Sequence, residues 1–157
     1  MSLPPCVEHV IPLPDAGQPA LAMGAWFRNT LCLVSDGRAY VSRSAGDLAT
    51  PDACRAHEEM ARELLALLDG KPAVIAHDLH PDFHSSRFAA QLAAELDVPL
   101  LAVQHHHAHI AAVCAEHNVS ESVLGLALDG VGWRATARGG RGFRAHRPSA
   151  PLASARR

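Results

Sequence analysis

The order of the secondary-structure elements that the sequence predicts is the feature that most constrains the fold. Three strand-like segments come first. Short apolar runs of strand length then alternate with longer segments in which apolar residues recur with the period of a helix. This alternation is typical of an α/β fold in which a mostly parallel sheet carries helices on both faces. In such sheets the functional sites lie at the carboxyl ends of the strands.

Turn and cap residues set the boundaries of these segments. Asp36-Gly37 supplies the positive φ angles of a tight hairpin turn. Thr50 and Pro51 are suited to begin the first helix, and Ser85 or Ser86 can cap the second. The expected elements are strands at 20–26, 31–34, 38–42, 73–76, 99–103 and 123–128, and helices at 51–69, from 85 or 86 to 96, and at 106–116.

Composition divides the chain into three parts. Residues 1–19 hold five of the eleven prolines, which keep the backbone extended, so we expect a Pro-rich linker there. Residues 20–132 contain all the predicted elements, and we expect them to form one lobe. Seven arginines and no acidic residue follow Gly132, whereas residues 1–132 carry seven basic and sixteen acidic groups. Residues 133–157 also lack a hydrophobic period, so we expect a basic irregular tail.

Several classes of protein are not expected from this sequence. No apolar run approaches the length of a membrane span, and the N-terminus does not resemble an export signal. The four cysteines are scattered and include no C-x-x-C pair, which suits free thiols in a reducing compartment. We therefore expect a cytoplasmic protein with no membrane partner.

A cluster of four histidines within five residues follows the strand at 99–103. His105 and His109 are separated by one helical turn, and paired imidazoles with this spacing can hold a transition metal. We expect these two residues to ligate a divalent metal, and we expect His106 and His107 to be solvated. The alternative is a helix start in which all four histidines are solvated.

The carboxyl ends of other strands carry further candidate residues. Asp129 ends the strand at 123–128 and could be a third ligand, while Gly130 and Gly132 permit close backbone approach to a phosphate. A plain turn is the alternative there.

Two more polar segments follow strands. Arg28, Asn29 and Thr30, after Gly24, could surround a phosphate, although an ordinary hairpin edge is also compatible with them. The histidines His77, His80 and His84 also follow a strand, and we expect them to be surface groups or neighbours of a metal site rather than direct ligands.

These motifs together resemble the HypF family, the carbamoyltransferases of nickel–iron hydrogenase maturation. Residues 103–112 are similar to its histidine signature, and 24–30 to its G-[GA]-x-x-K-N-T segment. Residues 46–48 resemble its G-D-L, 78–81 its D-x-H-P, and 123–132 its strand ending in D-G-x-G. The resemblance implies the first half of a transferase domain similar to the TsaD-type threonylcarbamoyl transferases, with a ribonuclease-H-like lobe of the actin-type ATPase fold and no second lobe.

The resemblance also implies a site. His105, His109 and Asp129 match three of four metal ligands for iron or zinc, and the fourth, an aspartate of the second lobe, has no counterpart here. Asn29 and Thr30 match the loop that faces ATP or carbamoyl-adenylate, with Arg28 in place of the usual lysine.

The implied reaction starts from carbamoyl phosphate and ATP. A carbamoyl group is transferred to the C-terminal cysteine of the partner HypE, where it becomes the cyanide ligand of the hydrogenase. We expect little transferase activity from a chain without the second lobe.

Two other functions remain open from the sequence. One is a non-catalytic module that binds metal or docks HypE, and the other is a tRNA-modifying transferase of the related family. The basic tail is typical of a nucleic-acid-binding arm. We hypothesise instead that residues 133–157 arise from a frameshift, because the family pattern stops at Gly132, and we therefore expect no nucleic-acid binding.

Overall fold

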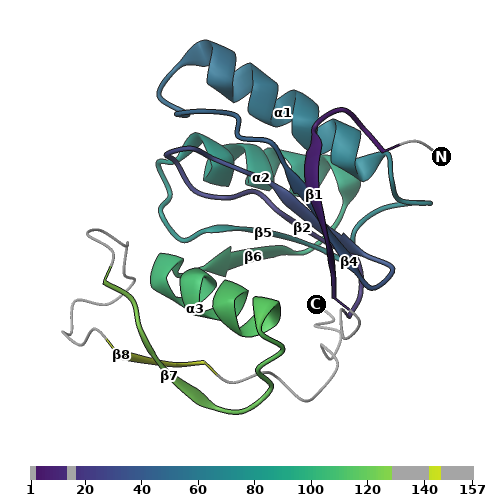
Figure 1. Ribbon diagram of the computed structural model, residues 1–157. Helices are drawn as coiled ribbons and strands as arrows, with labels where there is room; N and C mark the ends of the chain where they lie inside the picture. The colour runs from purple at the N-terminus through teal and green to yellow at the C-terminus, as the bar shows by residue number, and fades with distance from the viewer. Residues whose placement is uncertain (1–2, 14–16, 129–141, 146–157) are drawn as a thin grey trace.

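The computed structural model describes residues 3–13, 17–128 and 142–145, and its main feature is a six-stranded mixed sheet (Figure 1). The strands lie in the order β1-β4-β3-β2-β5-β6, and a separate two-stranded sheet contains β7 and β8. Their bounds are β1 Val7–Pro12, β2 Ala20–Ala22, β3 Cys32–Ser35, β4 Arg38–Ser42, β5 Val74–Asp78, β6 Leu100–Val103, β7 Val123–Leu126 and β8 Gly142–Ala145.

Three helices within the described residues accompany the sheet. They are α1 (Pro51–Leu65), α2 (His84–Leu96) and α3 (His105–Glu116). In Figure 1, α1 and α2 lie above the main sheet and α3 lies below it, as expected for helices on both faces. No helix in the described part of the chain is both long and apolar enough to cross a bilayer.

The main sheet is mixed, and the expectation that it is mostly parallel is wrong. Strands β2, β5 and β6 run parallel, but the three pairs β1–β4, β4–β3 and β3–β2 are antiparallel. The antiparallel pairing of β3 with β4 follows from the tight connection between them, where Asp36 and Gly37 have φ values of 50° and 71°. Positive φ at both central residues is typical of the two-residue turns that connect neighbouring antiparallel strands.

Strand β1 corrects the expectation of a linker over residues 1–19. Val7–Pro12 pairs antiparallel with β4 along its length, from the Val7–Ser42 partners to Pro12 and Arg38. The prolines did not prevent this pairing because β1 is an edge strand, where a missing backbone donor can face away from the sheet. The linker expectation is therefore wrong for these six residues.

The core lies between the upper face of the sheet and the helices α1 and α2. The inward residues Leu21, Leu33 and Ile75 come from three neighbouring strands and are 0% exposed. Met60, Leu64 and Leu92 of the two helices complete the same cluster. Alternate strand residues thus bury one face against the helices, and the opposite face of the sheet is left for the site described below.

The helix starts agree with the sequence for α1 and differ for α2. Thr50 caps α1 as predicted, and its side chain accepts a hydrogen bond from the amide of Ala53. The cap of α2 is Phe83, so the prediction of Ser85 or Ser86 is wrong. Both serines lie buried in the first turn, where their hydroxyls donate to the carbonyls of Ala25 and Asp78 instead.

The last predicted strand is present, but it lies outside the main sheet. Strand β7 pairs with β8, and Leu124 and Leu126 on one of its faces are 87% and 66% exposed. Its opposite face lies against α3, where a Cβ at Gly125 would come within 2.4 Å of Ile110. Strand β8 also corrects the expectation of an irregular tail for residues 142–145; the rest of 133–157 lies outside the described residues.

Candidate functional site

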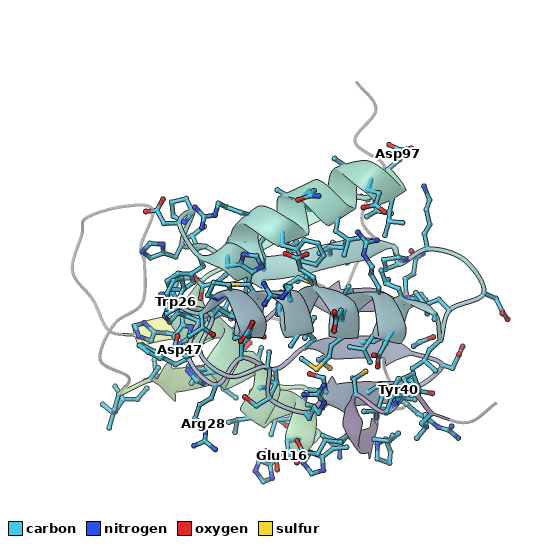
Figure 2. All side chains as sticks on the ribbon, turned by 90° about the horizontal axis from the view of Figure 1, so that it is seen from above. Trp26, Arg28, Tyr40, Asp47, Asp97 and Glu116 are labelled. Carbon is cyan, nitrogen blue, oxygen red and sulfur yellow. The ribbon has the colours of Figure 1, made fainter. Side chains whose placement is uncertain are left out.

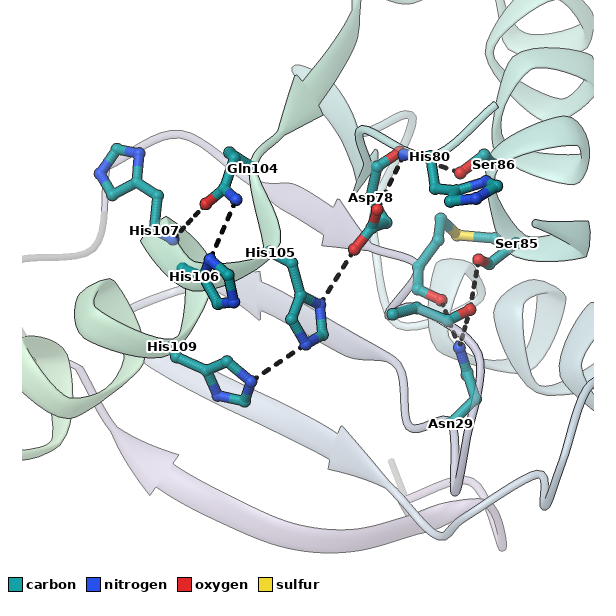
Figure 3. Close-up of polar contacts among 12 residues, drawn as sticks. Asn29, Asp78, His80, Ser85, Ser86, Gln104, His105, His106, His107 and His109 are labelled. Carbon is teal, nitrogen blue, oxygen red and sulfur yellow. Dashed lines mark hydrogen bonds and ion pairs between the residues drawn. The ribbon is translucent and has the colours of Figure 1, made fainter. Parts of the chain in front are cut away.

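The histidine cluster begins α3, immediately after β6. Gln104 caps the helix, because its side-chain oxygen accepts a hydrogen bond from the amide of His107 at 2.9 Å. His105 and His109 then lie one turn apart, as predicted, and their Nε2 atoms are 3.1 Å from each other (Figure 3). The structure therefore confirms the prediction that these two imidazoles lie side by side on one face of the helix.

The other two histidines of the cluster differ from each other. His107 is exposed, as predicted. His106 is only 8% exposed, and its Nδ1 lies 3.3 Å from the side-chain amide of Gln104. The expectation that His106 is solvated is therefore wrong: the second position of the helix turns inward while the third turns out.

Asp78 joins this pair from the neighbouring strand. Its Oδ2 lies 3.0 Å from Nδ1 of His105, and its side chain is 5% exposed. The parallel pairing of β5 with β6 places Asp78 opposite Val103, two residues before His105. The sequence reasoning singled out Asp78 only as part of a motif and missed this contact; its position at the end of a strand beside β6 was the available signal.

The segment after β2 forms the opposite wall of the site. Gly24 has a φ of 67°, and a Cβ there would come within 2.5 Å of the Thr30 carbonyl oxygen, so only glycine fits this turn. Asn29 is 2% exposed, and its amide donates to the carbonyls of Met23 and Ala25. Asn29 thus shapes the turn from behind, and its contact with a nucleotide stays a prediction.

A buried histidine of α1 supports the same turn from the core. Nε2 of His57 donates to the Met23 carbonyl at 2.9 Å, and the residue is 0% exposed. Burial lowers the pKa of His57, an effect that the hydrogen bond to Met23 offsets in part. The Met23 carbonyl therefore accepts two hydrogen bonds, one from α1 and one from Asn29.

A pocket of about 360 Å³ lies between the lower face of the sheet and α3, and it brings most of the described candidates together. Gly24 and Thr30 line one side, and His105 and His109 line the other. Arg28 is exposed and does not line this pocket. The remaining lining residues are mostly small or apolar: Ala22, Ala25, Ala76, His77, Asp78, Val103, Ala108 and Ala112.

The paired imidazoles fit a metal ion in chemistry and in spacing. Two nitrogens bound to one ion at about 2.0–2.1 Å lie roughly 2.8–3.4 Å apart when the angle they make at the metal is between a right angle and the tetrahedral angle. The observed 3.1 Å falls in that range and also suits an N–H···N hydrogen bond in the metal-free protein. Within the described ranges no group of three His, Cys, Asp or Glu side chains could hold a metal. The predicted Asp129, Gly130 and Gly132 lie outside those ranges.

The histidines around β5 occupy separate surroundings. His80 stacks on Phe83 with ring centroids 4.2 Å apart, and His84 pairs with Glu58 at 3.2 Å. Trp26, which is labelled in Figure 2, packs on the same Phe83 ring with centroids 5.2 Å apart. Of the three histidines near β5, His77 alone lines the pocket.

Comparison with known proteins gives a consistent result. Residues 15–116 match the family model described as "HypF Kae1-like domain". The chain is 52% identical over 124 residues to "Carbamoyltransferase HypF2" of Cupriavidus necator and 42% identical over 127 residues to "Carbamoyltransferase HypF" of Rhizobium leguminosarum bv. viciae. These alignments cover 79% and 81% of the chain, but only 15% and 16% of the relatives.

Solved structures agree with the sequence comparison. The crystal structure of T. kodakarensis HypF matches with a TM-score of 0.72 and 39% identity over 78% of the chain. A crystal structure of full-length HypF, described as phosphate- and nucleotide-bound, matches with a TM-score of 0.69 and 36% identity over 79% of the chain. In both cases the chain spans 16% of the larger protein.

Proposed function

This chain belongs to the HypF carbamoyltransferase family, and from that premise we propose that residues 20–132 are the first lobe of a carbamoyl-transferring domain. The proposed reaction transfers a carbamoyl group, derived from carbamoyl phosphate and ATP, to the C-terminal cysteine of HypE in the cytoplasm. The observation that carries the proposal is the convergence of His105 and His109 in one pocket with the Gly24 turn. The relatives that the chain matches are named HypF carbamoyltransferases, which favours this reaction over tRNA modification.

The strand order supports a ribonuclease-H-like lobe. Strands β4, β3 and β2 form an antiparallel meander, and β5 and β6 are added beside β2 through helical crossovers. That succession is the one expected for a lobe of the actin-type ATPase fold. We further propose that a second lobe is needed to close the nucleotide side, which agrees with the small share of the relatives that the chain spans.

We propose that His105 and His109 of this pocket hold a divalent metal, iron or zinc, and that Asp129, which lies outside the described residues, is the third ligand. A bound metal would supply Lewis-acid polarisation of the carbamoyl carbonyl. The residues of the chain do the rest: the two imidazoles fix the position of that group, and the Gly24–Thr30 turn offers close backbone approach on the opposite wall. The alanines that line the pocket leave space for a small planar group without competing polar contacts.

Metal titration of the purified chain tests the site directly. We expect one equivalent of Zn²⁺ or Co²⁺ to bind, and we expect His105→Ala or His109→Ala to weaken binding by at least about tenfold, because each removes one of few ligands. His107→Ala is the matched control, since His107 lies on the same helix turn but is exposed and outside the pocket. Equal binding by all three variants would exclude the proposed ligands.

Carbamoyl transfer to purified HypE tests the activity. The readout is the mass of the HypE C-terminal peptide after incubation with carbamoyl phosphate and ATP, and an intact HypF relative serves as the positive control. We expect the isolated chain to give little product and the intact relative to lose activity when its counterparts of His105 and His109 are replaced. An intact relative that remains fully active without them would refute the assigned role.

A further inference from the structure

We propose that Asp78 is a positioning residue that fixes the ring orientation and tautomer of His105, so that Nε2 of His105 is presented to the pocket as a ligand. The inference rests on the proposed metal site and deepens it. It concerns a residue at the end of β5, whereas the two histidines lie on α3, and it assigns Asp78 a part in the site that the histidine pair alone does not reveal.

The contact itself determines which ring nitrogen carries the proton. An ionised carboxylate can only accept hydrogen bonds, so Nδ1 of His105, at 3.0 Å from Oδ2 of Asp78, is the donor. In the neutral ring, Nε2 is then the nitrogen with the lone pair. That is the atom 3.1 Å from Nε2 of His109, on the side of the pocket.

The tautomer of His105 also determines the role of His109 in the hydrogen bond between the two rings. With the lone pair of His105 on Nε2, the hydrogen bond between the two rings requires His109 to donate from its own Nε2. A cation entering between the rings must displace that proton, which His109 can carry on Nδ1 instead. His105 is thus already in its ligating tautomer, while His109 must change, and Figure 3 shows the three side chains in this order.

Both the side chain and the backbone of Asp78 are held by hydrogen bonds. Its Oδ1 accepts the backbone amide of His80 at 2.8 Å, and its backbone carbonyl accepts the hydroxyl of buried Ser86 at 2.9 Å. The next amide, that of Leu79, donates to the Val103 carbonyl of β6 at 2.9 Å. The backbone that carries the carboxylate is therefore fixed to α2 and β6, and rotation of the side chain away from His105 would break its bond to the His80 amide.

The alternative is a purely structural ion pair that ties β5 to α3. Both roles predict some loss of stability when Asp78 is replaced, but only the positioning role predicts a change in tautomer and in metal affinity. Carboxylates that orient ligating histidines typically change metal affinity by about 10–100-fold when removed. Asp78→Asn keeps the size of the side chain and an oxygen acceptor for the His80 amide, so it isolates the loss of the carboxylate.

Two measurements test the proposal. In the first, nitrogen–proton NMR correlations of the metal-free chain should show His105 with its proton on Nδ1, and Asp78→Asn should move a substantial share of that proton to Nε2, which free histidine prefers. In the second, competition with a chromophoric chelator should show that Asp78→Asn binds Zn²⁺ or Co²⁺ about 10–100-fold more weakly than the wild type. Asp82→Asn is the matched control, because Asp82 is an exposed carboxylate of the same connection.

The two proposals fail in different ways. A wild-type chain that binds no metal would refute the metal site, while the His105 proton on Nδ1 would still support the role of Asp78. A wild-type His105 with its proton on Nε2 would overturn the role of Asp78 directly, even if Asp78→Asn failed to fold. Unchanged tautomer and affinity in a folded Asp78→Asn, or an equal loss of affinity in Asp82→Asn, would overturn it as well.

Discussion

The Gly24 turn gives the sharpest quantitative prediction, because the structure specifies what an added methyl group would meet. In Gly24→Ala the new Cβ would lie 2.5 Å from the Thr30 carbonyl oxygen and 2.6 Å from Nδ2 of Asn29. The first of these atoms belongs to the backbone and cannot move alone. The second belongs to an amide that is itself bonded to the carbonyls of Met23 and Ala25. Alanine at this position must therefore open the turn.

Two contributions determine how much the free energy of unfolding falls in Gly24→Ala. A side chain at the φ of 67° found at Gly24 costs about 1–2 kcal/mol relative to glycine. Displacing the Asn29 amide removes two hydrogen bonds worth about 1 kcal/mol each. Together they predict a loss of about 3–4 kcal/mol in the free energy of unfolding, a large part of the 5–15 kcal/mol that is typical of a domain.

Urea unfolding of three matched glycine variants separates the contributions. Gly46→Ala carries a positive φ of 94° but meets nothing closer than 3.8 Å, so it should lose about 1–2 kcal/mol. Gly17→Ala has open space around it and should change the free energy by less than about 1 kcal/mol. The three m-values should agree. If Gly24→Ala lost no more than Gly46→Ala, the close packing of the turn against Asn29 would be refuted.

Two further predictions concern α1. Thr50→Ala should reduce the free energy of unfolding by about 1 kcal/mol, because the cap to the Ala53 amide is lost, whereas Thr50→Ser should retain most of it; equal losses in a denaturant titration would contradict the cap. His57 should make the fold acid-sensitive: since burial lowers its pKa, the unfolded chain takes up a proton first as the pH falls below the ordinary 6.5, and stability is lost. His57→Gln does not titrate and should lose less stability than the wild type between neutral pH and pH 5, so parallel losses measured by thermal unfolding would refute this cause.

Local signals in the sequence predicted the parts of the fold that depend on neighbouring residues. The β3–β4 hairpin and the start of α1 at Thr50 follow from turn and cap chemistry within four residues, and both are present. The start of α2 was missed because Ser85 and Ser86 resemble caps, while their hydroxyls are used by the carbonyls of Ala25 and Asp78. Those carbonyls are distant in the sequence or lie on another element. The sequence alone therefore did not show that the hydroxyls bond to them instead of capping the helix.

The pairing partners of β1 and β7 were harder to predict, because they also depend on distant parts of the chain. Prolines in residues 1–19 indicated an extended chain correctly, but whether an extended segment pairs with a sheet depends on a free edge, here that of β4. Apolar residues at 123–128 indicated a strand correctly, but its neighbours were wrong: β7 lies outside the main sheet with Leu124 exposed. Strand character is local, whereas strand partners are set by the whole topology.

In the candidate site, one contact follows from local sequence spacing and the other from the register of two paired strands. The spacing of His105 and His109 predicts that they share a helix face, because helical geometry alone brings residues four apart together. Asp78 reaches His105 only because β5 and β6 pair in parallel with Asp78 beside Val103, across 27 residues of sequence. A shift of one residue in that register would point the Asp78 side chain to the α1–α2 face and leave His105 without its carboxylate. The register of one strand pair therefore decides whether two adjacent imidazoles become an oriented ligand set, and a substitution that disturbs β5–β6 pairing should alter metal affinity without touching a ligand.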